Sequence, residues 1–275
     1  MDESGFSAPE DVLASRHYAT KSALTSMSGP ALWLRSLCFN VGWYAGSVLI
    51  ALGGAPILLL PRRAVVVWAQ VWITFILWWL RVTCRLSHRV LGRENLPEGP
   101  VIIACKHQST WETLAFTLLF SDIAIVLKRE LLFIPVIGWA MARAGNIAVS
   151  RGEGASALRR LVRQAKAVVA DGRSIVIFPE GTRVAPGGQK PYQAGTAALY
   201  RQLGLPVVPV ALDSGVFWGR REFVKRPGVI TMEVLPPIPP GLGRGPFMAL
   251  LREHIETATA RLVDNAEKTG TKKEH

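Results

Sequence analysis

Two long uncharged apolar stretches near the amino terminus constrain the fold most strongly. Residues 37–60 contain no charged side chain over twenty-four positions, and residues 64–80 contain none over seventeen. A helix needs about 20 apolar residues to cross a bilayer, so the first stretch is long enough and the second is borderline. A soluble core can absorb one such segment, whereas two in tandem favour a membrane-embedded pair of hydrophobic helices. We expect this pair over residues 33–84, with buried helices of a soluble core as the alternative.

The charges beside these stretches leave two membrane arrangements open. Arg62 and Arg63 separate the stretches, and Arg81, Arg85 and Arg89 follow the second. Two full spans would place the first two arginines on the side opposite the rest of the chain. A hairpin that dips into one leaflet would keep every basic residue at one surface. The tendency of basic loops to stay inside does not choose between these arrangements.

The rest of the chain is basic. Residues 81–275 contain 27 Lys and Arg against 16 Asp and Glu, a net charge of +11, whereas residues 1–80 have a net charge of +1. Such a domain attracts polynucleotides and anionic lipid surfaces alike. No zinc-finger pattern, RNP-type motif or run of basic residues is present, which argues against nucleic acid and favours a lipid surface. Residues 217–226 mix aromatic and cationic side chains, as either a membrane-contact loop or a solvated loop would. Other cations recur on one predicted helix, and we interpret that basic face as solvated. They are Arg159, Arg160, Arg163 and Lys166.

The three cysteines point to neither a disulfide framework nor a metal site. Cys38, Cys84 and Cys105 lie in apolar surroundings and have no metal-ligand spacing. We therefore expect buried thiols in a reducing compartment and no bound metal.

Both ends of the chain read as polar tails. Residues 1–26 have no apolar core, so they do not resemble a cleaved signal. We expect a polar tail over residues 1–32, or an upstream extension if the protein begins at Met27. Residues 266–275 are polar and are expected to be a frayed tail.

A different pattern follows residue 88 and predicts an α/β domain over residues 85–265. Short runs rich in Val and Ile are each bounded by turn residues, which is typical of strands. Between them, residues 155–169 keep the spacing of one apolar helix face until Asp171 and Gly172 end the helix. This alternation predicts a mixed sheet flanked by helices. The predicted strands cover residues 101–105, 123–127, 146–149, 174–178, 207–212 and 229–235.

The segment KHQSTWE, residues 106–112, carries the first chemical hypothesis. His107 follows a predicted strand, and Glu112 lies in the first turns of a helix that we expect to begin near Ser109. From there the carboxylate can orient the imidazole, which leaves the other ring nitrogen free as a general base. However, Ser109 and Glu112 also form a Ser-x-x-Glu capping box, in which the glutamate only closes the helix end. The local sequence favours the cap slightly and leaves both interpretations open.

The segment FPEGTR, residues 178–183, is the second chemical motif. It ends the predicted strand 174–178, at the edge of an α/β sheet where ligands bind. Pro179 ends the strand ladder and Gly181 lets a ligand approach the backbone. Glu180 and Arg183 would stand at the mouth of the site, where the guanidinium can pair with a phosphate. A surface turn with an incidental ion pair is the alternative.

Together these two motifs resemble those of the glycerolipid acyltransferase family, in particular its bacterial lysophosphatidate acyltransferases. Two further blocks agree, and the four occur in the family's order over roughly residues 85–240. The first is Lys128 to Leu131 with Pro135, Gly138, Trp139 and residues 145–151, and the second is residues 207–210. The resemblance implies a glycerol-3-phosphate acyltransferase-like fold after the hydrophobic helix pair. It also implies an enzyme of phospholipid synthesis at the inner membrane, with the catalytic domain facing the cytoplasm.

The resemblance further implies a reaction and roles for residues. A fatty acyl group would pass from acyl carrier protein or acyl-CoA to the sn-2 hydroxyl of 1-acylglycerol-3-phosphate, giving phosphatidate without metal or cofactor. His107 would be the base and Glu112 its partner, and backbone N–H groups near the helix start would stabilise the oxyanion. Lys128, Arg151 and Arg183 would bind the phosphate. Glu180, Gly181 and Thr182 would shape the site.

Two departures from the family motif leave alternatives open. The family usually has aspartate where this chain has Glu112, and often asparagine where it has Lys106. The longer glutamate can reach the same ring from a slightly different helix position. The alternatives are a different acceptor, such as a lyso-ornithine lipid, or a non-catalytic relative that binds membranes.

Overall fold

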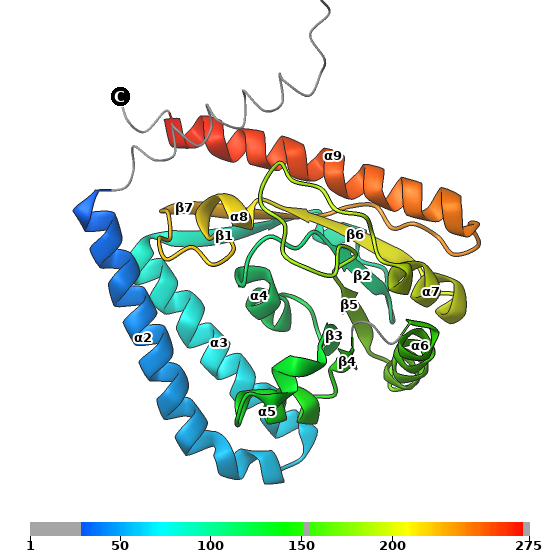
Figure 1. Ribbon diagram of the computed structural model, residues 1–275, viewed down its shortest axis with the longest axis horizontal. Helices are drawn as coiled ribbons and strands as arrows, with labels where there is room; N and C mark the ends of the chain where they lie inside the picture. The colour runs from blue at the N-terminus through cyan, green and yellow to red at the C-terminus, as the bar shows by residue number, and fades with distance from the viewer. Residues whose placement is uncertain (1–28, 151–153, 272–275) are drawn as a thin grey trace, which may run out of the picture.

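A computed structural model describes residues 29–150 and 154–271 of the 275-residue chain (Figure 1). Its centre is a mixed sheet in the strand order β1-β7-β6-β2-β5-β3-β4. Among the paired strands of the described residues, β6–β7 alone is antiparallel, so β2, β5, β3 and β4 all end at one edge, here called the carboxyl edge. The mixed α/β sheet predicted from the sequence is confirmed. The strands are β1 (Leu86–Leu91), β2 (Ile102–Cys105), β3 (Ile123–Lys128), β4 (Ile147–Val149), β5 (Ser174–Ile177), β6 (Val207–Leu212) and β7 (Gly228–Val234).

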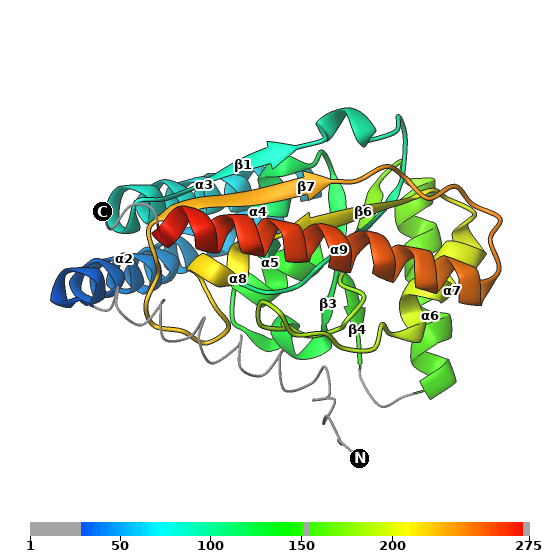
Figure 2. The same ribbon diagram turned by 90° about the horizontal axis from the view of Figure 1, so that it is seen from above.

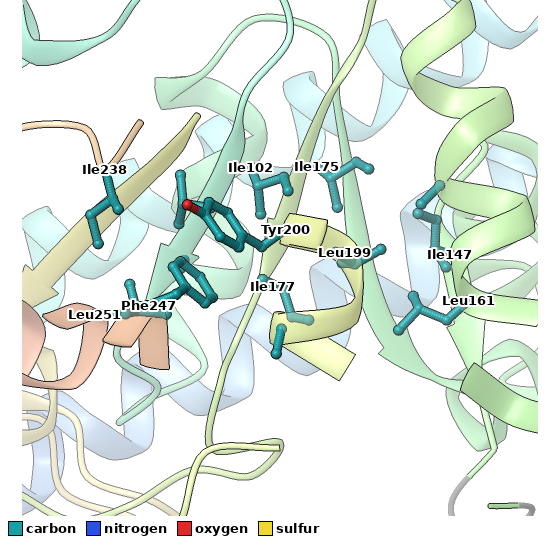
Figure 3. Packing of buried hydrophobic residues seen from close by; sticks show 14 of the residues in the cluster. Ile102, Ile147, Leu161, Ile175, Ile177, Leu199, Tyr200, Ile238, Phe247 and Leu251 are labelled. Atoms are coloured by element: carbon teal, nitrogen blue, oxygen red, sulfur yellow. The ribbon is translucent and has the colours of Figure 1, made fainter. Parts of the chain in front are cut away.

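Both faces of the sheet are covered, which explains why its central strands are continuous apolar runs. Neighbouring residues of β2 point to opposite faces, so Ile102 packs into one core and Ile103 into another. The first core, shown in Figure 3, joins β2 and β5 to Leu161, Tyr200 and Phe247. These three side chains come from the helices α6 (Gly154–Ala170), α7 (Ala194–Leu203) and α9 (Arg244–Thr271). The opposite face is covered by α4 (Trp111–Leu119) and α3 (Arg62–Cys84).

The predicted hydrophobic helix pair is present as α2 (Pro30–Gly54) and α3, joined by the 3-10 turn η1 (Ala55–Leu59). Glycines let the two helices approach closely, because a Cβ at Gly42 or Gly54 would collide with Trp79 or Trp68 of α3. Both helices are long and apolar enough to cross a membrane by length and composition alone. They differ in burial, since 28% of the apolar window of α3 is buried against 6% for α2. One face of α3 therefore packs on the α/β domain, and α2 lies outside α3.

The arrangement separates two ends of the molecule. Figures 1 and 2, related by a quarter turn, both show α2 and α3 at one end and α6 and α7 at the other. Helix α4 lies between these ends, beside the central strands (Figure 1). Short elements complete the fold. They are η2 (Arg93–Asn95), η3 (Arg129–Phe133), α5 (Ile137–Arg143) and α8 (Ser214–Phe217).

Two features of the α/β domain differ from the sequence predictions. The predictions omit β1, because its sequence LSHRVL is polar in the middle, as suits a strand at the edge of the described sheet, where its partner is β7. Among the cysteines, Cys38 is exposed because it lies on the outer helix α2, whereas the other two are buried as expected.

The predicted tails are shorter than expected at both ends. Helix α2 already begins at Pro30, because proline suits the first turn of a helix. Helix α9 continues to Thr271, so residues 266–271 are helical rather than frayed, and Ala266 packs against the core around α3. Residues 1–28 and 272–275 of the predicted tails lie outside the described residues.

The loop 217–226 is neither fully solvated nor a free membrane contact. Trp218 and Lys225 are buried, and the backbone N–H of Lys225 donates to Ser36 Oγ of α2 at 2.9 Å. The Lys225 ammonium lies 5.3 Å from the Trp218 ring centroid and 5.7 Å from that of Phe39. Burial lowers the pKa of Lys225 to about 8. This side chain therefore fastens the loop to the first hydrophobic helix.

Candidate active site

The two sequence motifs meet at the carboxyl edge because β2 and β5 are neighbouring parallel strands. His107 follows β2, and Glu180 follows β5. The two loops are joined directly, since the N–H of Val184 donates to the carbonyl oxygen of His107 at 2.8 Å. A second contact crosses between them, from Arg183 Nη1 to Thr110 Oγ1 at 2.7 Å. The structure therefore brings the two motifs together.

His107 and Glu112 form a hydrogen-bonded pair. His107 lies in the loop before α4, and Glu112 lies in the first turn of that helix. His107 Nδ1 is 2.9 Å from Glu112 Oε1, and the glutamate side chain is completely buried. Because a carboxylate only accepts hydrogen bonds, this contact selects the tautomer of the neutral imidazole that has its proton on Nδ1 and a lone pair on Nε2. The geometry is that of an oriented imidazole base.

The same carboxylate oxygen also closes the helix end. Glu112 Oε1 accepts the backbone N–H groups of Gln108 at 2.7 Å and Ser109 at 2.6 Å. Ser109 Oγ in turn accepts the N–H of Trp111 at 3.2 Å. Half of the predicted capping box is therefore present, because Glu112 binds the N–H of Ser109 while the Ser109 hydroxyl binds Trp111 and not Glu112. The glutamate contact at the helix start and the imidazole contact coexist and are not alternatives. Because these three N–H groups are engaged in the cap, they are not free to stabilise an oxyanion.

The second nitrogen of His107 remains available. The imidazole stacks on Phe178, with ring centroids 4.1 Å apart, and 15% of the histidine side chain is exposed. Within the described part of the chain, Nε2 has no hydrogen-bond partner. An accessible, unpaired nitrogen can accept a proton from a bound hydroxyl.

Glu180 lies beneath the site and not at its mouth, contrary to the sequence prediction. Its Oε1 accepts from Lys106 Nζ at 2.7 Å, and its Oε2 accepts the backbone N–H of His107 at 3.3 Å. Lys106 is 1% exposed and also contacts Glu256 of α9 at 2.8 Å. Burial raises the pKa of Glu180, and the ammonium of Lys106 opposes that effect. Glu180 therefore positions the backbone of His107 and balances a buried lysine.

The other residues of the second motif form a tight turn. The N–H of Gly181 donates to the carbonyl oxygen of Phe178 at 2.9 Å, and Gly181 has φ +64°. Thr182 and Arg183 follow the turn and are half-buried. Burial lowers the pKa of Arg183, and the carboxylate of Glu112 opposes that shift. A guanidinium stays protonated even so, which leaves a positive charge beside the His107 pair.

Lys128 stands at the same edge, two strands from His107. The β3–β5 and β2–β5 registers, extended by a few residues, bring Lys128 level with Pro179 and Lys106. The Lys128 side chain is exposed. Arg151, the third predicted phosphate ligand, lies outside the described residues. The carboxyl edge thus carries Lys128, Arg183 and the His107 pair.

Sequence reasoning missed Ser214, which completes the support of the pair. Ser214 Oγ donates to Glu112 Oε2 at 2.8 Å and is fully buried. Beside it, the N–H of Gly215 donates to Gln108 Oε1 at 3.0 Å. The sequence feature that could have indicated Ser214 is the Asp-Ser-Gly segment directly after the predicted strand 207–212. Ser214 is 102 residues from Glu112 in the sequence. Across the described ranges, no group of three or more His, Cys, Asp or Glu side chains is placed to hold a metal ion.

Comparison with known proteins agrees with this geometry. The acyltransferase family model matches residues 87–213, a range that contains both motifs. The 1-acyl-sn-glycerol-3-phosphate acyltransferase of Pseudomonas aeruginosa is 40% identical over 177 residues, which are 64% of this chain and 68% of that protein. The chain belongs to the acyltransferase family.

Other acyltransferases match over shorter parts of their length or at lower identity. The 1-acyl-sn-glycerol-3-phosphate acyltransferase of Saccharomyces cerevisiae is 28% identical over 58% of this chain and 54% of its own length. Among solved structures, the 1-acyl-sn-glycerophosphate acyltransferase of Thermotoga maritima superposes with a TM-score of 0.68 at 21% identity. That match covers 83% of this chain and 95% of the Thermotoga chain, and it shows that the two share a fold.

Proposed function

We propose that this acyltransferase transfers a fatty acyl group from a thioester donor to the sn-2 hydroxyl of 1-acylglycerol-3-phosphate. The observation that carries the proposal is the His107–Glu112 pair, with its free Nε2 at the carboxyl edge. Membership of the acyltransferase family and the names of the relatives support the same reaction. The products are phosphatidate and the free thiol of the donor.

The proposed step uses His107 as a general base. Nε2 takes the proton of the sn-2 hydroxyl while its oxygen attacks the thioester carbonyl carbon. The C–S bond then breaks, and the leaving thiolate sulfur takes this proton from the imidazolium. Glu112 is 2.9 Å from Nδ1 and stabilises the positive charge that forms on the ring. The thioester is already activated, so the step as proposed uses no metal, cofactor or covalent acyl-enzyme.

The phosphate of the acceptor is proposed to bind the cations of the same edge. Arg183 is held by Thr110, beside the His107 loop, and Lys128 stands two strands away. Arginine suits a phosphate because its planar fork donates two hydrogen bonds. Arg151 follows β4 by two residues in the sequence and is proposed as the third ligand. Gly181 and Thr182 shape the turn that carries Arg183.

The hydrophobic pair is proposed to hold the enzyme at the inner membrane, with the catalytic domain in the cytoplasm. Large apolar side chains of α2 are exposed, with Leu49 at 70% and Leu52 at 73%. One face of α3 is occupied by the α/β domain, which favours a hairpin dipping into one leaflet over two free spans.

The acceptor is the point that an experiment can decide. Purified protein in detergent is given acyl-CoA with either lysophosphatidate or lyso-ornithine lipid, and thiol release and diacyl product are both measured. We expect thiol release with lysophosphatidate, matched one to one by phosphatidate. Turnover with lyso-ornithine lipid alone would replace the proposed acceptor, and turnover with neither would favour a non-catalytic membrane-binding relative.

A further inference from the structure

A basic groove lies between α6 and α7, away from the His107 site. Its volume is about 640 Å³, and it is open to solvent. Figures 1 and 2 both place these helices at the end of the molecule opposite α2 and α3. The hydrophobic pair therefore leaves this groove open to the aqueous phase, so a soluble partner can reach it more easily than a lipid surface can.

The charge of the groove is of one sign. Its cationic side chains are all exposed, and none of them forms an ion pair with a carboxylate of the described residues. Neither α6 nor α7 contains an aspartate or glutamate. A concave surface whose charges are all positive concentrates anionic partners and speeds their association. The cations are Arg159, Arg163 and Lys166 of α6, Arg201 of α7, and Arg244 at the start of α9.

The floor of the groove is apolar. Leu158 and Val162 contribute from α6, and Ala198 contributes from α7. These apolar side chains are half-buried, whereas the basic side chains of the lining are exposed, so we place the apolar residues at the floor and the cations at the rim. An amphipathic acidic helix matches this pattern, because its apolar residues can cover the floor while its carboxylates meet the rim.

The amino-terminal end of α7 connects the groove to the second motif. Helix α7 begins one residue after Gln193, whose backbone N–H donates to the carbonyl oxygen of Pro179 at 2.7 Å. Ala194, the first residue of α7, lines the groove. A protein bound in the groove at Ala194 would therefore lie close to the FPEGTR turn, which in turn contacts the His107 loop.

We propose that the α6–α7 groove is the docking site for an acidic helix of a soluble protein that carries the acyl thioester. The proposal rests on the proposed function, because it assigns the place where one kind of donor binds. It replaces the interpretation of the α6 cations as a merely solvated face. A small thioester donor such as acyl-CoA would reach the carboxyl edge without needing the groove.

The test compares two donors on charge-reversal variants. One variant carries Arg163→Glu with Lys166→Glu, and a second carries Arg201→Glu, so that the result does not depend on one helix. The control carries Lys268→Glu with Arg93→Glu, which changes the net charge as much as the first variant but at exposed positions outside the groove. Each is assayed with lysophosphatidate and either acyl carrier protein or CoA as the acyl carrier, and thermal unfolding confirms that each is folded.

We expect the groove variants to lose at least about tenfold in kcat/KM with acyl carrier protein and to keep their activity with acyl-CoA, because steering of a charged partner is lost. The wild-type rate with acyl carrier protein should fall with salt, and the variants should show a flatter dependence. Equal losses with both donors, no loss with either, or a wild type that uses only acyl-CoA would each overturn the docking site. In these three outcomes the acyl-CoA reaction still supports the proposed function, whereas product with neither donor would refute that function itself.

Discussion

Replacing Glu112 with glutamine separates the two roles of this side chain. The amide oxygen can still accept the N–H groups of Gln108 and Ser109, and the amide nitrogen can donate to Ser214 Oγ. The helix cap is therefore retained, and the free energy of unfolding should change by only about 1 kcal/mol. What the substitution removes is the negative charge that faces the ring of His107.

The kinetic effect follows from the 2.9 Å contact between Nδ1 and Oε1. At an effective dielectric constant of about 20, two unit charges at that distance attract by roughly 6 kcal/mol. The amide dipole that remains offsets part of this loss, which leaves about 3–4 kcal/mol against the imidazolium that forms in the transition state. This corresponds to a fall in kcat of about 10²–10³-fold.

The assay is thiol release from acyl-CoA with lysophosphatidate, together with thermal unfolding of the same preparations. Glu112→Gln should show the large fall in kcat with a melting temperature within about 4 °C of wild type. Glu112→Asp should keep part of the activity, since its charge is retained. Ser214→Ala serves as the matched control, because it removes one contact to the carboxylate and leaves the charge in place. Near wild-type activity of Glu112→Gln would refute the reasoning, since it would show that Glu112 only caps the helix.

Three further predictions concern other groups of the site and the core. Lys106→Met should lower the free energy of unfolding by about 3–5 kcal/mol, because it leaves the carboxylates of Glu180 and Glu256 without their cation. Adding Glu180→Gln and Glu256→Gln should restore most of the lost stability. A thermal unfolding series that shows no loss, or no restoration, contradicts the buried ion-pair account. Burial raises the pKa of the Asp213 carboxyl to about 7, from a value near 4 in the unfolded chain. Between these two pH values the folded protein binds one more proton than the unfolded chain, so the free energy of unfolding falls as the pH rises. Asp213→Asn should flatten this dependence between about pH 4 and 7 in urea unfolding, and an unchanged slope would speak against it. Arg183→Ala should raise KM for lysophosphatidate about tenfold or more, as expected for the loss of charge-assisted hydrogen bonds, with little change in KM for acyl-CoA. An equal rise for both substrates would remove Arg183 from the phosphate site.

Much of the fold was predictable because its signals are local. Each central strand is a short Val- and Ile-rich run between turn residues, and all six predicted strands are present. The apolar face of α6 and the lengths of α2 and α3 could also be recognised from residues close in sequence. Strand β1 has polar residues in its middle, and its partner strand β7 is far away in the sequence. The paired residues Arg89 and Thr231, for example, are 142 positions apart, so no local pattern identifies β1 as part of the sheet.

The site was predictable only as far as the two motifs reach. Their meeting follows from parallel strands that end at one edge, which the pattern of strands and helices implies. The burial of Glu180 was not predictable, because it depends on Lys106 and on Glu256, 150 residues beyond that lysine in α9. The contact of Ser214 with Glu112 likewise depends on β6 lying next to β2. The sequence left two roles open for Glu112, as partner of His107 or as part of a helix cap. The position of Oε1 shows that one oxygen contacts both the imidazole and the backbone N–H groups at the helix start.

The central claim is that His107 acts as the base on lysophosphatidate, and one measurement tests it most directly. Phosphatidate formation from lysophosphatidate and acyl-CoA is followed for wild type and His107→Ala, with unfolding curves for both. The account predicts one phosphatidate per thiol released by wild type, and a fall of at least about 10²-fold in His107→Ala without loss of folding. A folded His107→Ala that forms phosphatidate at close to the wild-type rate would contradict it.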